Sequence, residues 1–212
     1  MFHPLLGRRG LYAITDGSLA DPVAAAQAAL EGGAALLQYR NKTSAHPRRL
    51  DEAVALAKLC MRFGVPLIVN DDVELALASG AAGVHLGEDD VPIAGARTVL
   101  GRGAIIGVSC YDSLERARDA SAAGADYLAF GAFFPSPTKP DARRATPGLL
   151  REARTFGKPL VAIGGVTPDN GGSLIAAGAD FLAVISAVFA AQDIRAAARR
   201  FTGLFDTTHS PR

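Results

Sequence analysis

The chain has 212 residues, of which 49% are hydrophobic and 20% charged, and its formal net charge is +1. The near-neutral charge and scattered basic residues argue against nucleic acid as a partner, no apolar stretch is long enough for a membrane, and two cysteines are too few for a disulfide framework. We therefore expect one cytoplasmic domain over residues 1–212, with a core at about 11–203 and peripheral or frayed ends at residues 1–9 and 206–212.

Eight short apolar runs recur along the chain, and most of them end in a glycine or a polar residue. Alanine-rich segments with helical spacing separate these runs, and Asp21, Asp112 and Thr167 are expected to cap three of the helices. In chain order the predicted strands are Leu11–Thr15, Ala35–Arg40, Leu67–Asn70, Gly83–Leu86, Ala104–Ser109, Tyr127–Phe133, Leu160–Gly165 and Phe181–Ser186.

The second, fourth, sixth and eighth strands share an entry motif in which a glycine follows a helical segment, as helix C-caps do. The motif is Gly32-Gly33-Ala34, Ser79-Gly80-Ala81, Ala123-Gly124-Ala125 and Ala177-Gly178-Ala179. It divides the chain into four strand–helix–strand–helix quarters. The runs are also continuously apolar, which is typical of parallel strands covered on both faces. The sequence thus predicts a (β/α)8 TIM barrel, with a doubly wound open sheet as the alternative.

The second strand ends in a basic edge. Alternation along a strand places Gln38, Arg40 and Lys42 on one side, facing the predicted barrel mouth. An amide and two cations suit an anionic, oxygen-rich ligand, which arginine binds bidentately and lysine as a point charge. The alternative is a solvated strand end, but active sites of such barrels lie where the strands end.

Acidic residues follow the third and fourth strands. Asn70 and Asp71 end one strand, and Asp90 lies in the loop after the next, so the two carboxylates can reach one Mg²⁺. We interpret Asp72 and Asp89 as helix caps instead. His85 lies inside the fourth strand and is expected to be a buried, hydrogen-bonded structural histidine.

The last three strands lead into loops that suit phosphate. A stiff proline-rich loop presents Ser136, Thr138 and Lys139, and the charged stretch 141–144 after it is a candidate lid. Gly164-Gly165 and Ser186 end the seventh and eighth strands, where barrels often hold phosphate. No pair of nucleophile and base is visible, which favours a reaction driven by departure of a leaving group.

These motifs, in their order and spacing over about residues 11–190, closely resemble the thiamine phosphate synthase family. The resemblance rests on Tyr12-Ala13-Ile14-Thr15-Asp16, Gln38-x-Arg40-x-Lys42, Asn70-Asp71, Val84-His85-Leu86-Gly87 through Asp90, Gly107-Val108-Ser109, Pro135 to Lys139, Ile163-Gly164-Gly165 and Ile185-Ser186. It implies a transferase of thiamine biosynthesis that condenses hydroxymethylpyrimidine pyrophosphate with a thiazole phosphate. Pyrophosphate would leave first, and the thiazole nitrogen would capture the resulting pyrimidine-methyl cation.

The resemblance also implies roles for individual residues. The pyrimidine pyrophosphate would be bound by Gln38, Arg40, Lys42, Asn70, Ser109 and Lys139, and its Mg²⁺ by Asp71 and Asp90. The thiazole phosphate would be bound by Ser136, Thr138, Gly165, Ile185 and Ser186. The residues expected to act in catalysis are Arg40, Lys42, Ser109 and Lys139. These small molecules are the expected partners, and the oligomeric state stays open, with a homo-oligomer as one option.

The chain departs from the family's usual pattern at Ser136, Glu88 and Tyr111, which stand where Thr, Gln and His are common. The missing histidine disfavours a thiazole tautomerase of the same fold. A non-catalytic thiamine-precursor binding protein should have lost Asp71, Asp90 or Lys139, and all three are present. A metal-free phosphosugar isomerase would need a general base at the mouth, and none can be named.

Overall fold

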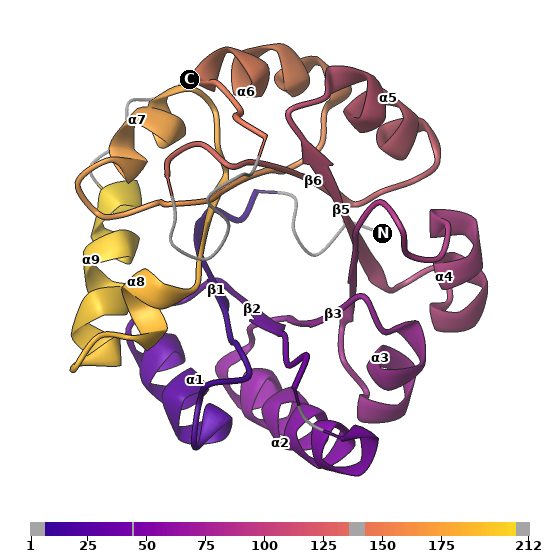
Figure 1. Cartoon of the computed structure of the whole chain (residues 1–212), viewed down its shortest axis with the longest axis vertical. Helices are drawn as coiled ribbons and strands as arrows, with labels where there is room; N and C mark the ends of the chain where they lie inside the picture. Colours follow the sequence, from indigo (N-terminus) through magenta and orange to yellow (C-terminus); the bar gives the residue numbers. More distant parts are fainter. Residues whose placement is uncertain (1–6, 44, 136–142, 207–212) are drawn as a thin grey trace.

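Eight parallel strands close into a barrel in which each strand pairs with the next and β8 pairs with β1 (Figure 1). The computed structural model describes residues 7–43, 45–135 and 143–206. This closure confirms the predicted TIM barrel and excludes the open sheet. The strands are β1 Gly10–Ile14, β2 Leu36–Tyr39, β3 Leu67–Asn70, β4 Gly83–Leu86, β5 Ile105–Tyr111, β6 Tyr127–Phe130, β7 Leu160–Ile163 and β8 Phe181–Val184.

Helices surround the barrel as an outer ring (Figure 1). They are α1 Pro22–Glu31, α2 His46–Phe63, α3 Val73–Ser79, α4 Ile93–Leu100, α5 Leu114–Ala122, α6 Pro147–Ala153, the 3₁₀ turn η1 Arg154–Phe156, α7 Gly171–Ala176, α8 Ser186–Phe189 and α9 Ile194–Asp206. None of these described helices combines the length and the apolar character needed to cross a bilayer.

Two of the three predicted helix caps are wrong. Asp21 does cap α1, since its carboxylate accepts the backbone N–H groups of residues 23 and 24. Asp112 does not cap α5, because the next residue, Ser113, accepts the N–H of Arg116 and starts the helix. Thr167 does not cap α7 either, because residues 168–170 form a turn and the helix begins only at Gly171.

Some element boundaries also differ from the prediction. Helix α2 begins at His46, where the proline that follows suits the first helical turn. Strands β6, β7 and β8 end two or three residues before their apolar runs do. In β7 the reason is visible, since Gly164 and Gly165 take positive φ values of 99° and 63° and turn the chain into a loop.

The strands contribute alternate residues to two separate apolar layers. One layer fills the barrel interior, and its buried members are Tyr12, Ile14, Leu36, Ile68, Ile105, Tyr127, Ala129, Val161, Phe181 and Ala183. The other lies between the strands and the helices and holds most of the remaining buried apolar residues. The barrel is therefore filled with side chains below its mouth, as small barrels are, and is not a pore.

Gly107 on β5 makes room for the ring of Tyr127, one of two tyrosines in that interior. A Cβ atom at this position would lie 1.9 Å from Cζ of Tyr127, which is fully buried. Neither the ring nor the strand can move aside easily, because both are held within the closed sheet. Glycine at residue 107 is thus a packing requirement of the barrel interior.

We predict that Gly107→Ala lowers the free energy of unfolding by about 1–3 kcal/mol, because it overpacks the interior. Gly95→Ala is the matched control, since a Cβ on that residue of α4 meets nothing within 4 Å. The control should be neutral or stabilise the chain by up to about 1 kcal/mol. Urea denaturation of both variants tests this, and equal effects of the two substitutions would contradict the packing argument.

Candidate active site

Polar side chains replace apolar ones on the inward faces of the strands as these strands approach their carboxyl ends. The inward-facing polar residues are Gln38 on β2, Asn70 on β3, His85 on β4 and Ser109 on β5. Because all eight strands are parallel, these positions gather at one mouth of the barrel. The sequence prediction that this edge carries the chemistry therefore has a geometric basis.

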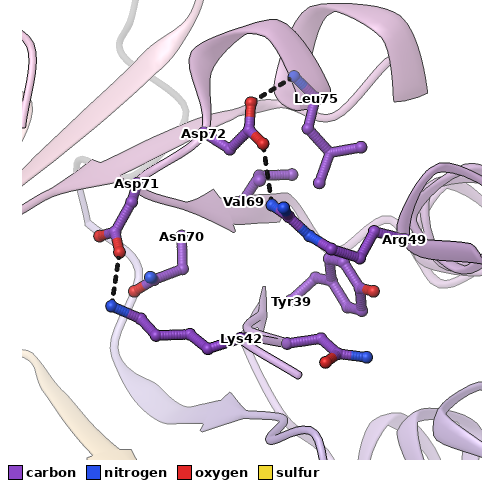
Figure 2. A pocket seen from close by; sticks show the side chains of 9 residues that line it. Tyr39, Lys42, Arg49, Val69, Asn70, Asp71, Asp72 and Leu75 are labelled. Atoms are coloured by element: carbon purple, nitrogen blue, oxygen red, sulfur yellow. Dashed lines mark hydrogen bonds and ion pairs between the residues drawn. The ribbon is translucent and has the colours of Figure 1, made fainter. Parts of the chain in front are cut away.

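An ion pair joins the loops after β2 and β3 at this mouth. Nζ of Lys42 lies 2.9 Å from Oδ2 of Asp71, and Figure 2 shows the lysine side chain extending along the pocket to reach it. Asp71 has a φ of 63°, a conformation that few residues other than glycine, asparagine and aspartate adopt. Its N–H donates to the backbone oxygen of His85 at 2.8 Å, which anchors the residue to β4.

Asp90 brings a second carboxylate to Asp71. Its Oδ2 accepts the N–H of Gly87 at 2.6 Å, and its carboxyl group lies close enough to that of Asp71 to feel its negative charge. Burial raises the pKa of Asp90, and the negative charge of Asp71 raises it further, against the opposing effects of Gly87 and Lys42. Two facing carboxylates are oxygen donors for which a divalent cation would relieve the mutual repulsion.

Among the described residues, no cluster of three or more His, Cys, Asp or Glu side chains forms a ready-made metal cage. This does not conflict with Mg²⁺, which usually keeps several waters and is bound by one or two carboxylates together with substrate phosphates. The donor set of Asp71 and Asp90 thus fits a magnesium ion that arrives with an anionic substrate. Lys42 adds a cation to the same cluster, through its ion pair with Asp71.

A cavity of about 370 Å³ opens beside this cluster, between the loops that follow β2 and β3 (Figure 2). Its lining residues are Tyr39, Asn41, Lys42, Arg49, Val69, Asn70, Asp71, Asp72 and Leu75. Asp72 faces away from the ion pair of Lys42 and instead bonds Arg49 at 2.8 Å and the N–H of Leu75 at 2.9 Å. Its predicted role as the cap of α3 is confirmed. The same prediction for Asp89 is wrong, because α4 begins at Ile93 after Pro92.

His85 is buried and hydrogen-bonded, as predicted. Its Nδ1 lies 2.9 Å from the hydroxyl of Tyr127, and its Nε2 lies 2.9 Å from Oγ of Ser109. Burial lowers the pKa of His85 to about 4, although the nearby Asp71 carboxylate acts in the opposite direction. The imidazole is therefore neutral at physiological pH and serves as a hydrogen-bonding link between β6 and β5.

The loops after β7 and β8 lie at the same mouth. Asn170 holds the first loop in place, because its Nδ2 donates to the oxygen of Gly165 and its Oδ1 accepts the N–H of Thr167. A Cβ at Gly165 would lie 2.4 Å from the oxygen of Pro135, so only glycine fits there. Ser186 is exposed at the start of α8, directly after the half-buried Ile185.

The structure describes most of the residues that the sequence singled out, but not all. Arg40 follows β2 and is half-buried, with its N–H donating to Oγ1 of the buried Thr15 at 3.0 Å. The predicted ligands Ser136, Thr138 and Lys139, and residues 141 and 142 of the candidate lid, lie outside the described residues. Their predicted roles are therefore untested.

Two of the three departures from the family pattern meet at Arg143. The guanidinium of Arg143 lies 5.5 Å from the ring centroid of Tyr111, and its Nη2 lies 3.9 Å from Oε2 of Glu88. Arg116 lies on the same ring at 5.7 Å. Glu88 and Tyr111 thus both contact Arg143, which the sequence alone did not indicate.

Sequence reasoning missed three residues of the site. Tyr12 and Tyr127 connect Gln38 to His85 inside the barrel, and Arg49 lines the cavity. The two tyrosines could have been found from strand alternation, because Tyr127 shares the inward parity of Ala129 and Tyr12 that of Ile14. No local signal in the sequence marks Arg49, which lies in the first turn of the long helix α2.

Known proteins that resemble this chain in sequence point to one family. The chain matches the thiamine monophosphate synthase family over residues 11–188. The thiamine-phosphate synthase of Thioalkalivibrio sulfidiphilus is 55% identical over 202 residues, which cover 93% of this chain and 96% of that protein. That of Methylobacillus flagellatus is 53% identical over 206 residues, covering 96% and 99%.

A solved structure leads to the same family. The thiamine phosphate pyrophosphorylase from Pyrococcus furiosus is 36% identical and superposes with a TM-score of 0.88, covering 98% of each chain. Structures of other barrels below 25% identity, such as the geranylgeranylglyceryl phosphate synthase from Thermoplasma acidophilum at 13%, share only the fold. By sequence and by structure, this chain belongs to the thiamine monophosphate synthase family.

Proposed function

We propose that this chain is a thiamine-phosphate synthase, a transferase of thiamine biosynthesis. It joins 4-amino-2-methyl-5-hydroxymethylpyrimidine pyrophosphate to hydroxyethylthiazole phosphate and releases pyrophosphate. The observation that carries the proposal is the cluster of Lys42, Asp71 and Asp90 at the barrel mouth, beside a polar cavity. Relatives with this activity in their names match the chain at 53–55% identity over nearly its whole length.

The acidic pair is the proposed site for Mg²⁺. Asp71 and Asp90 would hold the ion from two adjacent strand ends, and the substrate's pyrophosphate and water would complete its oxygen shell. When bound, the ion supplies positive charge that stabilises the departing pyrophosphate. Lys42 already lies within the cluster, and Arg40 follows the same strand, so both cations would serve the same anion.

The proposed reaction begins with departure of the leaving group. The bond between the pyrimidine methylene carbon and the pyrophosphate oxygen breaks, and its electron pair leaves with the pyrophosphate. The lone pair of the thiazole nitrogen then forms the new bond to the methylene carbon. The hydroxyl of Ser109 lies 2.9 Å from Nε2 of His85, but the proposed steps need no nucleophile from the protein, so its residues would act by positioning and by charge.

The thiazole phosphate would occupy the loops after β7 and β8. Gly165 allows close approach of the backbone, and Ile185 leads into α8, whose first residue is Ser186. Ser136, Thr138 and Lys139 would complete the two anion sites from the loop after β6. We further propose a cytoplasmic location, supported by two buried free thiols, Cys60 and Cys110, and leave the oligomeric state as an open part of the proposal.

The first test is pyrophosphate release by the purified protein with the pyrimidine pyrophosphate and Mg²⁺. We expect release together with thiamine phosphate when the thiazole phosphate is present, and loss of both products when EDTA removes the metal. A tautomerase would instead isomerise a thiazole substrate without releasing pyrophosphate. A binding protein would retain thiazole phosphate in calorimetry but release nothing, and either result would overturn the proposal.

We predict that Asp71→Asn lowers kcat/KM for the pyrimidine pyrophosphate by about 100-fold or more, because a metal ligand and a charge are lost. Asparagine tolerates the positive φ of residue 71, so the backbone stays intact. The KM for thiazole phosphate should change less than about twofold, because that site is separate. Asp89→Asn, which removes an equal charge from an exposed neighbour of Asp90, is the control. Similar losses for both variants would count against the metal assignment.

We predict that Ser186→Ala raises the KM for thiazole phosphate by about 10-fold, because a hydrogen bond to a charged group is lost. The KM for the pyrimidine pyrophosphate should change much less. Ser173→Ala removes an exposed hydroxyl that bonds only within its own helix start, and it should leave both values unchanged. A larger effect of Ser186→Ala on the pyrimidine substrate would refute the division into two sites.

A further inference from the structure

A continuous chain of hydrogen bonds crosses the interior of the barrel just below its mouth. Gln38 Nε2 bonds the hydroxyl of Tyr12 at 2.7 Å, and this hydroxyl bonds that of Tyr127 at 2.8 Å. The Tyr127 hydroxyl reaches Nδ1 of His85 at 2.9 Å, and Nε2 of His85 reaches Oγ of Ser109 at 2.9 Å. The five residues come from five different strands. The series begins and ends at Gln38 and Ser109, two of the side chains expected to bind the pyrimidine pyrophosphate.

The chemistry of the groups gives this chain one direction. The amide nitrogen of Gln38 can only donate, so the Tyr12 hydroxyl accepts that hydrogen bond. Tyr12 then uses its own O–H to donate a hydrogen bond to the hydroxyl of Tyr127. Tyr127 in turn donates to Nδ1 of His85, which must then be unprotonated. The neutral imidazole carries its proton on Nε2 and donates to Ser109, whose own proton is left to point elsewhere.

Burial keeps the linking groups of this hydrogen-bonded series uncharged. Tyr12 and Tyr127 are at most 1% exposed, and burial raises the pKa of both hydroxyls. The rings are also tightly held: those of Tyr12 and Tyr127 meet edge to face at 85°, and His85 stacks on Tyr127 at 17°. Tyr12, Tyr127 and His85 are therefore neutral and fixed in place. What remains to be set is the proton order, meaning which of the two groups in each hydrogen bond is the donor.

We infer that Tyr12, Tyr127 and His85 are positioning residues that set a single proton order, which makes Gln38 an acceptor and Ser109 a donor toward the pyrimidine. This inference rests on the proposed function for the identity of the ligand. The Oε1 atom of Gln38 can only accept, and it is the free end of the amide that donates to Tyr12. At the other end of the series, the Ser109 hydroxyl accepts the hydrogen bond from Nε2 of His85, which leaves its own O–H to donate to the ligand.

The proton order selects a class of ligand. A 4-aminopyrimidine carries N–H donors on its amino group and acceptors on its ring nitrogens, so it can satisfy Gln38 and Ser109 at the same time. A 4-oxopyrimidine presents a carbonyl oxygen and a ring N–H, which reverses this pattern. Sites built from fixed donors and acceptors reject such mismatches strongly, because buried groups are left unpaired.

The direct test is the tautomer of His85 at pH 7, read from ¹⁵N chemical shifts of labelled histidine. His85 is one of four histidines, and replacing His3, His46 and His209 by asparagine leaves it as the only signal. We expect the tautomer protonated on Nε2. A proton on Nδ1 would mean that the whole chain runs in the opposite direction, and a doubly protonated ring would break it, so either result overturns the inference. This measurement needs no turnover, and its outcome is therefore independent of the proposed function.

A second test removes the central hydroxyl. Tyr127→Phe keeps the ring and frees Nδ1 of His85, so we expect a mixture of tautomers and a loss of about 10- to 100-fold in kcat/KM for the pyrimidine pyrophosphate. The KM for thiazole phosphate should stay within about twofold. Phe181→Leu, a substitution in the same interior layer at a residue without a hydrogen-bonding side chain, controls for loosened packing. An equal loss for both substrates, or the same pattern in Phe181→Leu, would reduce Tyr127 to a structural role.

The ligand part of the inference has its own test. The wild-type protein should use the 4-oxo analogue of the pyrimidine pyrophosphate at least about 100-fold less efficiently than the 4-amino substrate. Comparable use of the two would overturn the proposed match between proton order and substrate. If the wild-type protein turns over neither compound, the proposed function fails, while the tautomer of His85 still decides the direction of the chain.

Discussion

The constraint on which this structure depends is the closure of eight parallel strands into a barrel too narrow to stay empty. Closure forces alternate residues of every strand into one shared interior, where they must fill the space and satisfy each other's polar groups. Near the amino ends of the strands, apolar side chains such as Phe181 and Ile105 meet this demand. Near the carboxyl ends the interior meets water, and the inward positions become polar.

The barrel separates two kinds of polar interaction by depth. Below the mouth, where water is excluded, the polar groups are neutral and joined end to end, because an unpaired buried hydroxyl would cost about 1–3 kcal/mol. At the mouth, where water enters, charged groups such as Lys42 and Asp71 form an ion pair with substantial exposure. A pyrophosphate with its metal suits the outer, charged level, and a heteroaromatic ring suits the inner, neutral one.

His85 connects the two levels. Its ring belongs to the neutral interior chain of hydrogen bonds through Tyr127 and Ser109, while its backbone oxygen accepts the N–H of Asp71 and so helps to hold this proposed metal ligand in a positive-φ conformation. One strand residue thus positions groups proposed to bind both halves of the same substrate. This is a physical reason for a histidine inside β4 that needs no role in proton transfer.

The sequence by itself determined the barrel, the strand order and the residues at the strand ends, because glycine caps and apolar runs are local signals that repeat in register. It also placed Asp71, Asp90 and Gln38 at the mouth, since alternation and parallel pairing leave few other arrangements. Only the tertiary structure decided that Tyr12 and Tyr127 link Gln38 to His85, that Arg143 meets both Glu88 and Tyr111, and that Ser113 and not Asp112 caps its helix. These features depend on which side chains meet across the closed sheet, and such distances are set by closure and not by any local pattern.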